Sequence, residues 1–213
     1  TDLLVVCTDT PYNGVYYFEN SGVIDEETDL PIFKPSIRLG KAVDNASISY
    51  IQDKAVITTP QKTYPDFKNS LFEHPEKILS SDIKELYPEG VYIRANQWKF
   101  IDFNGDDLLD ILVGVGVWGD YGWDDAYDAN GKWTNGPLHG YIYLIENIGS
   151  NENPNYIDPV QLCNTDGIPL DVFGRPSPNF ADFNGDGKPD LLCGEFRDGF
   201  TFFENVGSLY NPL

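Results

Sequence analysis

The chain has 213 residues, and its 34 acidic and 14 basic side chains give a formal net charge of −20. So acidic a chain is a poor fit to a nucleic-acid-binding protein, because phosphate backbones are held by Lys and Arg. Hydrophobic residues make up 41% of the chain, and no apolar run approaches the ~18 residues of a membrane helix, so disorder and a membrane-spanning helix are both excluded.

The first predicted elements are short strands. Asp2 is followed by the apolar run Leu-Leu-Val-Val, and Gly14–Gly22 reads Gly-Val-Tyr-Tyr-Phe-Glu-Asn-Ser-Gly. β-Branched and aromatic residues bounded by Gly and Asn are typical of strands. A weaker copy of this order follows at Ser47–Asp53 and Lys54–Thr59, joined by a tight turn. Only Glu73–Leu86, in the next connector, has a modest helical pattern.

Two later segments match each other closely. Phe100–Gly114 reads Phe-Ile-Asp-Phe-Asn-Gly-Asp-Asp-Leu-Leu-Asp-Ile-Leu-Val-Gly, and Phe180–Gly194 reads Phe-Ala-Asp-Phe-Asn-Gly-Asp-Gly-Lys-Pro-Asp-Leu-Leu-Cys-Gly. Each is followed by a second shared phrase, at Gly140–Gly149 and at Gly199–Gly207, which also matches Gly14–Gly22. Repetition of this kind indicates an array of one supersecondary unit.

Each unit has the pattern of four short strands. In the third unit we expect strands at about Gln97–Asp102, Asp110–Val113, Tyr141–Glu146 and Tyr156–Leu162. Antiparallel four-stranded units of roughly 40–50 residues are typical of β-propeller blades. The sequence therefore predicts an all-β fold of β-propeller blades, with a β-sandwich of meanders as the alternative.

The chain is predicted to form a single partial propeller. We expect a partial blade at 1–40, a degenerate blade at 41–80, a third blade at about 90–165 with a long insertion at 115–139, and a partial fourth blade at 173–213. This makes about three and a half blades, whereas propellers close with about four to eight. Because folded proteins avoid open sheet edges, we expect a larger ring of about seven blades, completed by the same or another chain.

Asp-rich loops join the first two strands of the third and fourth units. Oxygen-bearing side chains recur at positions 1, 3, 5 and 9, with a backbone carbonyl at position 7: Asp102, Asn104, Asp106, Leu108 and Asp110 in the first loop, and Asp182, Asn184, Asp186, Lys188 and Asp190 in the second. Alternate oxygen ligands can wrap one hard cation, and without a cation the carboxylates repel one another. The sequence therefore predicts two Ca²⁺ sites, with an ion-free Asp/Asn/Gly turn as the alternative.

Two details distinguish these loops. Position 12 is Val113 or Cys193, where an EF-hand has a bidentate Glu, so the loops are not EF-hands. Position 6 is Asp107 in the first loop and Gly187 in the second. Since Asp adopts a tight left-handed turn less easily than Gly, we expect the first loop to bind Ca²⁺ more weakly.

The phrase Asp-Phe-Asn-Gly-Asp-Gly-x-x-Asp, followed by an apolar strand, resembles the FG-GAP/VCBS family of calcium-binding propeller repeats. The resemblance covers nearly the whole chain and is strongest in the two full copies. It implies a calcium-braced propeller of a bacterial exported type, located outside the cell, in the periplasm or on the cell surface, with Ca²⁺ held by the loop positions given above. It implies no reaction, because propellers have many functions.

The long connection Val115–His139 is the main candidate for a ligand site. If the first strand of a blade runs away from it, this connection lies at the end opposite the acidic loops. Aromatic faces beside Asp acceptors suit sugar rings. The candidate ligand-binding residues are Trp118, Asp120, Tyr121, Trp123, Asp124, Tyr127, Trp133 and His139. The alternatives are a small core within the insertion, or a further cation site at Asp120, Asp124, Asp125 and Asp128.

Three arginines are expected at the same end of the blades: Arg94, Arg175 and Arg197. Together they can anchor a carboxylate or sulfate of an anionic polysaccharide, and surface pairing with local Asp is the alternative. Three functions therefore stay open: carbohydrate binding, a polysaccharide lyase or glycoside hydrolase, and a protein-interaction or adhesion platform. For an enzyme the candidate catalytic residues are His139, Tyr121, Arg175 and Arg197.

Overall fold

The computed structural model describes residues 1–52, 54–70, 72–78, 93–117, 127–134, 138–196 and 199–212. In this part of the chain antiparallel β-structure dominates, and the one helix described, α1 (Phe67–Ser70), is a single turn. The all-β prediction is confirmed. Among the described residues, no helix is long and apolar enough to cross a membrane.

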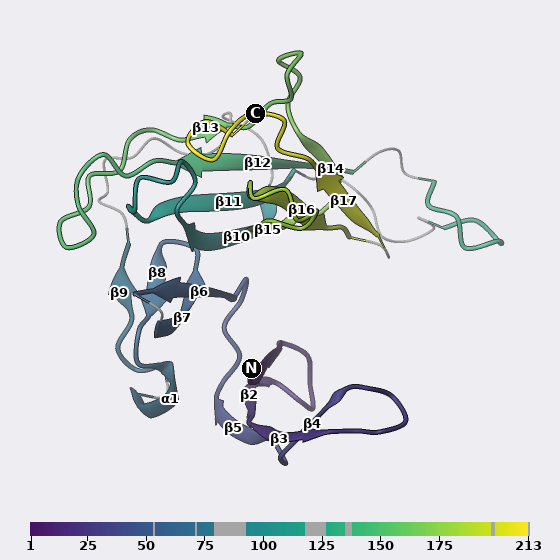
Figure 1. Ribbon diagram of the computed structural model, residues 1–213. Helices are drawn as coiled ribbons and strands as arrows, with labels where there is room; N and C mark the ends of the chain where they lie inside the picture. Colours follow the sequence, from purple (N-terminus) through teal and green to yellow (C-terminus); the bar gives the residue numbers. More distant parts are fainter. Residues whose placement is uncertain are drawn as a thin grey trace.

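The strands form four main sheets in chain order, which we call sheets 1 to 4 (Figure 1). Sheet 1 contains β1 (Leu3–Cys7), β2 (Gly14–Phe18) and β5 (Ile37–Gly40). A separate hairpin of β3 (Asn20–Ile24) and β4 (Pro31–Phe33) lies between β2 and β5 along the chain. Sheet 2 contains β6 (Ser47–Ile51), β7 (Lys54–Thr59), β8 (Lys62–Tyr64) and β9 (Glu76–Lys77). Sheet 3 contains β10 (Ile93–Ile101), β11 (Asp110–Val117), β12 (His139–Ile145), β13 (Val160–Gln161) and β14 (Asp171–Phe173). Sheet 4 contains β15 (Ser177–Ala181), β16 (Asp190–Gly194) and β17 (Phe200–Phe203).

Two local expectations differ from the structure. Glu76–Lys77, inside the segment with a helical pattern, is the strand β9, because pairing with β8 outweighs a weak helix preference. Residues 79–86 of that segment lie outside the described part of the chain. The fourth strand expected in the third unit is reduced to β13, since Pro159 interrupts it and Pro cannot donate to a ladder.

Sheets 2 and 3 are buried on both faces. Successive side chains of a strand point to opposite faces, so Val56 packs on sheet 3 while its neighbour Ile57 packs on sheet 1. In sheet 3, Val113 packs toward sheet 2 and its neighbour Leu112 toward sheet 4. These strands therefore need continuous apolar runs instead of the alternating pattern of a half-exposed sheet.

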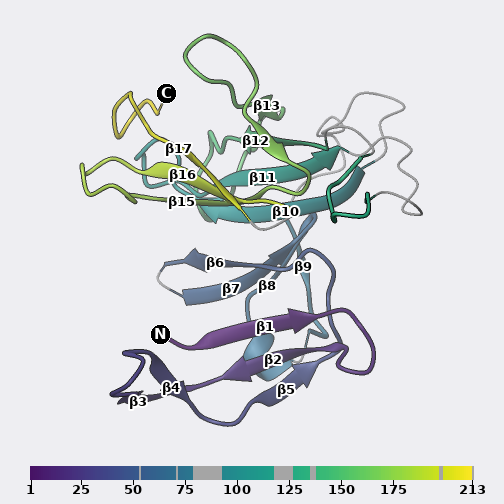
Figure 2. The ribbon, with the colours of Figure 1, turned by 90° about the vertical axis from the view of Figure 1, so that its right-hand side faces the viewer.

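Three apolar clusters join the four sheets in chain order. The first joins sheets 1 and 2, the second joins sheets 2 and 3, and the third joins sheets 3 and 4. Figure 2 shows sheet 1 lowest, sheet 2 above it and sheet 3 above that. Each sheet thus covers one face of the next sheet in the chain.

Polar contacts also tie the first strands of neighbouring sheets together. The Ser47 hydroxyl of β6 donates to Gln97 Oε1 of β10 at 2.9 Å. The ammonium of Lys99, also on β10, donates to Asn179 Oδ1 of β15. Burial lowers the pKa of Lys99, because the charged ammonium loses water there. These contacts link β6 to β10 and β10 to β15, so they help to hold sheets 2, 3 and 4 next to one another in that order.

Truncation of Trp98 to Ala is expected to destabilise the protein by about 3–5 kcal/mol, because this side chain is buried between sheets 2 and 3. Urea unfolding followed by circular dichroism measures the change. Tyr50→Ala, at an exposed aromatic position of β6, is the control and should change stability by no more than about 0.5 kcal/mol. Equal effects of the two substitutions would contradict the packing described here.

Candidate functional site

The first Asp-rich loop connects β10 to β11 and is organised by its first carboxylate. Asp102 Oδ1 accepts hydrogen bonds from the backbone N–H groups of Gly105 (2.8 Å) and Asp106 (3.1 Å), and Oδ2 accepts one from Asp107 (3.1 Å). Asp107 has a φ of 65° and Gly105 a φ of 72°, so both adopt the left-handed conformation. The backbone of the loop thus curls around the Asp102 carboxylate and donates three hydrogen bonds to it.

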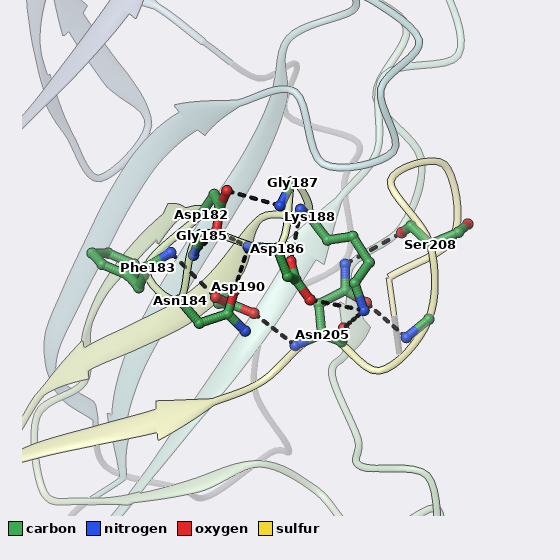
Figure 3. A network of polar contacts seen from close by, with 11 residues as sticks. Asp182, Phe183, Asn184, Gly185, Asp186, Gly187, Lys188, Asp190, Asn205 and Ser208 are labelled. Carbon is green, nitrogen blue, oxygen red and sulfur yellow. Dashed lines mark hydrogen bonds and ion pairs between the residues drawn. The ribbon is translucent and has the colours of Figure 1, made fainter.

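The second loop, between β15 and β16, repeats this arrangement (Figure 3). Asp182 Oδ1 accepts from the N–H groups of Gly185 (2.7 Å) and Asp186 (3.2 Å), and Oδ2 accepts from Gly187 (2.9 Å). Asn184 Oδ1 also accepts from the N–H of Asp186, at 2.9 Å. Gly187 has a φ of 84°, so position 6 is left-handed in both loops and only the first places a side chain there.

The carboxylate at position 9 is buried and joins the loop to the strand ends. In the second loop, Asp190 Oδ2 accepts from the N–H of Phe183 at 3.2 Å and Oδ1 accepts from that of Asn205 at 2.9 Å (Figure 3). The side chain of Asn205 in turn accepts from the N–H of Gly207 and donates to the carbonyl of Ser208. A buried carboxylate is tolerated here because backbone donors satisfy it.

The same Asp-to-Asn contact occurs three times. The N–H of an Asn in the repeated Glu-Asn phrase donates to Oδ1 of the Asp that begins, or immediately precedes, the second strand: Asn20 to Asp2 at 3.0 Å, Asn147 to Asp110 at 2.8 Å and Asn205 to Asp190 at 2.9 Å. The repeated phrase is visible in the sequence, but the pattern alone assigns these asparagines no role. Their recurrence was the signal that could have identified them.

The electrostatics of the two loops differ. In the second loop, Lys188 Nζ lies 3.2 Å from Asp186 Oδ2 and donates to the carbonyl of Asn205 at 2.6 Å. The first loop has Leu108 at this position. Hydrogen bonding from the Lys188 N–H is the main reason why the pKa of Asp186 is lowered, and the Lys188 charge adds to it.

The first loop instead concentrates negative charge. Asn104 Nδ2 donates to both Asp106 Oδ2 (3.1 Å) and Glu146 Oε1 (3.3 Å). Burial, together with the charges of Asp106 and Glu146, raises the pKa of Asp110 to about 6, against the lowering effect of its backbone donors. A positive ion at this loop would relieve the repulsion.

The donor chemistry of both loops fits Ca²⁺, because every donor is a carboxylate, amide or carbonyl oxygen. Asp102 uses three of its roughly four acceptor sites on backbone N–H groups, which leaves one for an ion. In the described ranges no three His, Cys, Asp or Glu side chains are grouped closely enough to hold a metal ion. An ion in either loop therefore also needs the Asn and backbone oxygens.

A cavity of about 350 Å³ lies near the second acidic loop, between sheets 3 and 4. Its lining is mostly apolar and includes Phe103, Leu162, Phe180, Phe203 and Val206. Phe103 and Phe180 stack there with their ring centroids 5.2 Å apart. Few polar groups line this cavity, so it suits an apolar group better than a sugar.

The opposite end of sheet 3 holds a polar group built on β12 and β14. Val117 ends β11 and pairs with His139, whereas Asp110 begins β11 and pairs with Ile101, so His139 lies at the end of the sheet away from the first acidic loop. His139 Nδ1 is 2.6 Å from Asp171 Oδ2, and Asp171 Oδ1 accepts from the N–H of Gly140 at 3.2 Å. Asp171 therefore fixes the orientation of the imidazole.

The His139 ring lies parallel to that of Tyr141, with the centroids 6.1 Å apart and an angle of 4° between the planes. Burial raises the pKa of Tyr141, and the charge of Asp171 adds to this effect. The side chains of His139 and Asp171 are 42% and 41% exposed, so both are accessible to a ligand. The arrangement offers an oriented imidazole, a carboxylate and a phenol on one surface.

The described part of the insertion forms a small core. Trp133 is 9% exposed and packs with Leu138 against Phe173 and Phe196, so little of its ring is left for a ligand. Tyr127 pairs edge-to-face with Trp133 at 5.3 Å and is itself exposed. Of these two aromatic residues, Tyr127 is the one available to a ligand.

The structure leaves several candidates undescribed. Those outside the described residues are Trp118, Asp120, Tyr121, Trp123, Asp124, Asp125 and Arg197, together with the side chain of Arg94. Arg175 is exposed on the connection between β14 and β15. Asp128 accepts hydrogen bonds from the N–H groups of Asn130 and Lys132 and so organises its own turn.

No family model, curated protein or solved structure matches this chain. The resemblance to FG-GAP/VCBS repeats therefore depends on the loop motifs and their spacing alone.

Replacement of Asp107 by Gly is expected to stabilise the protein by about 0.5–1 kcal/mol, because Gly adopts the left-handed conformation without strain from a Cβ. The reverse exchange in the second loop, Gly187→Asp, should destabilise by a similar amount. Thermal unfolding of both variants measures the changes. A destabilising Asp107→Gly substitution would show that the Asp107 side chain has a role beyond filling this position.

Proposed function

We propose that this chain is part of a Ca²⁺-stabilised β-propeller of FG-GAP/VCBS type whose end opposite the acidic loops binds carbohydrate. The observation that carries the proposal is the recurrence of one loop, with the same carboxylate-to-backbone contacts, between the first two strands of sheets 3 and 4. Conformity of the two copies in structure as well as sequence favours a shared ligand over two unrelated turns.

Calcium is the ion that suits these loops. The ligands would be the side chains at positions 1, 3, 5 and 9 and the carbonyl at position 7, which are hard oxygen donors in a flexible turn. The bound ion supplies positive charge and fixed coordination, so its role is structural. We also propose an exported location. Extracellular Ca²⁺ modules have dissociation constants of about 10⁻⁴–10⁻³ M, so Ca²⁺ outside the cell can fill structural sites of this kind.

The ring arrangement is supported by how the sheets pack. Each sheet covers the next sheet in chain order, and both faces of the two middle sheets pack against neighbouring sheets. In a two-layer sandwich every sheet keeps one outer face, so the middle sheets fit a radial array better.

Carbohydrate binding is assigned to the end that holds His139. Tyr127 and Tyr141 supply aromatic faces, Asp171 supplies an acceptor and Arg175 supplies a cation for an anionic sugar. Aromatic faces combined with a few fixed polar groups are the usual elements of sugar recognition. The acidic loops lie away from this surface, so the metal would support the fold without touching the ligand.

A second candidate function is a polysaccharide lyase or glycoside hydrolase that uses the same surface. The contact between His139 Nδ1 and Asp171 favours it, because a carboxylate that orients an imidazole prepares the other ring nitrogen for proton transfer. Tyr141, whose pKa is raised, stays protonated at neutral pH and can donate a hydrogen bond to a bound sugar.

Addition of Ca²⁺ to about 100 times its dissociation constant at both sites should raise the melting temperature by about 10–20 °C, and a chelator should reverse the rise. Isothermal titration calorimetry should show two sites, one lost in Asp102→Ala and the other in Asp182→Ala. Asp166→Ala, at an exposed Asp in another turn, should keep both sites. Absence of Ca²⁺ binding by the folded protein would reject the metal proposal.

A glycan array probed with the Ca²⁺-loaded protein should show binding, with acidic glycans preferred. His139→Ala should weaken binding about tenfold or more, because the ring and its contact with Asp171 are lost, whereas His74→Ala should have no effect. Release of unsaturated or reducing ends that His139→Ala abolishes would favour the enzyme. A folded, Ca²⁺-loaded protein that binds no glycan would refute the carbohydrate proposal.

A further inference from the structure

The turn that follows β12 holds the first Asp-rich loop from outside. The side-chain amide of Asn151 makes two hydrogen bonds with the loop backbone: its Oδ1 accepts from the N–H of Leu109 at 2.9 Å, and its Nδ2 donates to the carbonyl of Asp107 at 2.8 Å. The two bonds lie on either side of Leu108, whose carbonyl is the expected Ca²⁺ ligand at position 7. Asn151 therefore fixes the backbone on both sides of the residue that would bind through its carbonyl.

Peptide geometry then sets the direction of the Leu108 carbonyl. Both peptides of Leu108 are trans, so the C=O and the N–H of each point in opposite directions. The peptide before Leu108 directs its C=O to Asn151, while its N–H donates to Asp106 Oδ1 at 2.9 Å on the other side of the chain. The peptide after Leu108 directs its N–H to Asn151, so the Leu108 carbonyl points away from Asn151, toward the side of the Asp106 carboxylate. Positions 5 and 7 thus present their oxygens on one side.

The turn that carries Asn151 has a counterpart in sheet 4. In both turns the N–H of a Ser donates to the carbonyl three residues later, at 3.2 Å for Ser150 and 3.1 Å for Ser208. Counted from the Asn of the Glu-Asn phrase, the residue at the place of Asn151 is Leu209. The side chain of Leu209 has neither a donor nor an acceptor, so the second loop cannot be held by the contact that Asn151 makes.

The second loop restricts the same carbonyl in another way. Its position 8 is Pro189, which has no N–H for a side-chain amide to bind. A proline ring also excludes the helical region for the residue before it, here Lys188, and so restricts the ψ angle that orients the carbonyl at position 7. Pro189 thus does within the chain what Asn151 does from a neighbouring turn.

We propose that Asn151 is a positioning residue for Ca²⁺ at the first Asp-rich loop, where it holds the Leu108 carbonyl on the side of the Asp106 carboxylate. Pro189 has the same role for Lys188 in the second loop. The inference rests on the Ca²⁺ sites put forward under Proposed function. A ligand whose backbone is already fixed loses little conformational freedom when an ion binds, and the freedom of one residue corresponds to about tenfold in a binding constant.

Isothermal titration calorimetry with Ca²⁺ tests the role of Asn151, in an Asp182→Ala background that leaves the first site to be measured alone. Asn151→Leu should raise the dissociation constant of this site about tenfold, because the carbonyl at position 7 is no longer fixed. Asn153→Leu is the matched control, since it makes the same substitution at an exposed position of the same turn. It should leave the dissociation constant unchanged.

The device of the second loop should rescue the first. Asn151→Leu combined with Leu109→Pro should recover most of the lost affinity, since the proline restricts the residue before it directly. The reverse pair uses the second site, measured in an Asp102→Ala background: Pro189→Leu should weaken it and the addition of Leu209→Asn should restore it. Circular dichroism confirms that each variant is folded, and the two pairs are independent, so one unfolded variant leaves the other pair as the test.

Amide hydrogen exchange without Ca²⁺ gives a readout that does not depend on the metal. The N–H of Leu109 should exchange slowly in the parent and faster in Asn151→Leu, because its acceptor is removed. Equal exchange rates, an unchanged first-site affinity in Asn151→Leu, or a double variant as weak as the single one would each overturn the inference while the Ca²⁺ proposal stands. A folded parent that binds no Ca²⁺ would instead refute the proposed function and this inference together.

Discussion

The hydrogen bond between an Asp carboxylate and the N–H of the Asn in the Glu-Asn phrase is the contact on which the repeat in sheets 1, 3 and 4 depends. In sheet 3 it joins the start of β11 to the end of β12, and the second carboxylate oxygen holds the backbone of the loop at Phe103. Because a shift of one residue would move every side chain to the other face, a fixed strand end also fixes which residues are buried. The Asp110 carboxylate therefore fixes the backbone of the Asp-rich loop, the strand register and, through the register, which side chains are buried on each face.

Two-faced burial explains how so acidic a chain supports a core. The charges are placed in the turns and connections, while the strands carry runs such as Ile111–Val113 that are buried on alternate sides. Both faces of a middle sheet pack against a neighbouring sheet, so stability depends on neighbours on both sides. The surfaces available to ligands are then the two ends of the sheets, where the turns gather.

Much of this could be predicted from the repeated phrases. They place the second and third strands of sheet 3 to within a few residues, because an Asp and the Glu-Asn phrase mark the strand ends in sheets 1, 3 and 4. Contacts between distant segments were not predictable. Asp171 lies 32 residues from His139, and nothing in the local pattern indicated that β14 would pair with β12. The side chain of Lys188 was likewise overlooked, since position 7 was considered only for its carbonyl oxygen.

The lysine of the second loop has a consequence for the response to ionic strength. Added salt screens the attraction between Lys188 and Asp186, which are 3.2 Å apart, and so loosens a contact that the second loop makes for itself. In the first loop the same ions screen the repulsion of Asp110 by Asp106 and Glu146. Two loops of almost identical backbone therefore respond differently to electrolyte, and the difference arises from Lys188 at position 7 of the second loop and Asp107 at position 6 of the first.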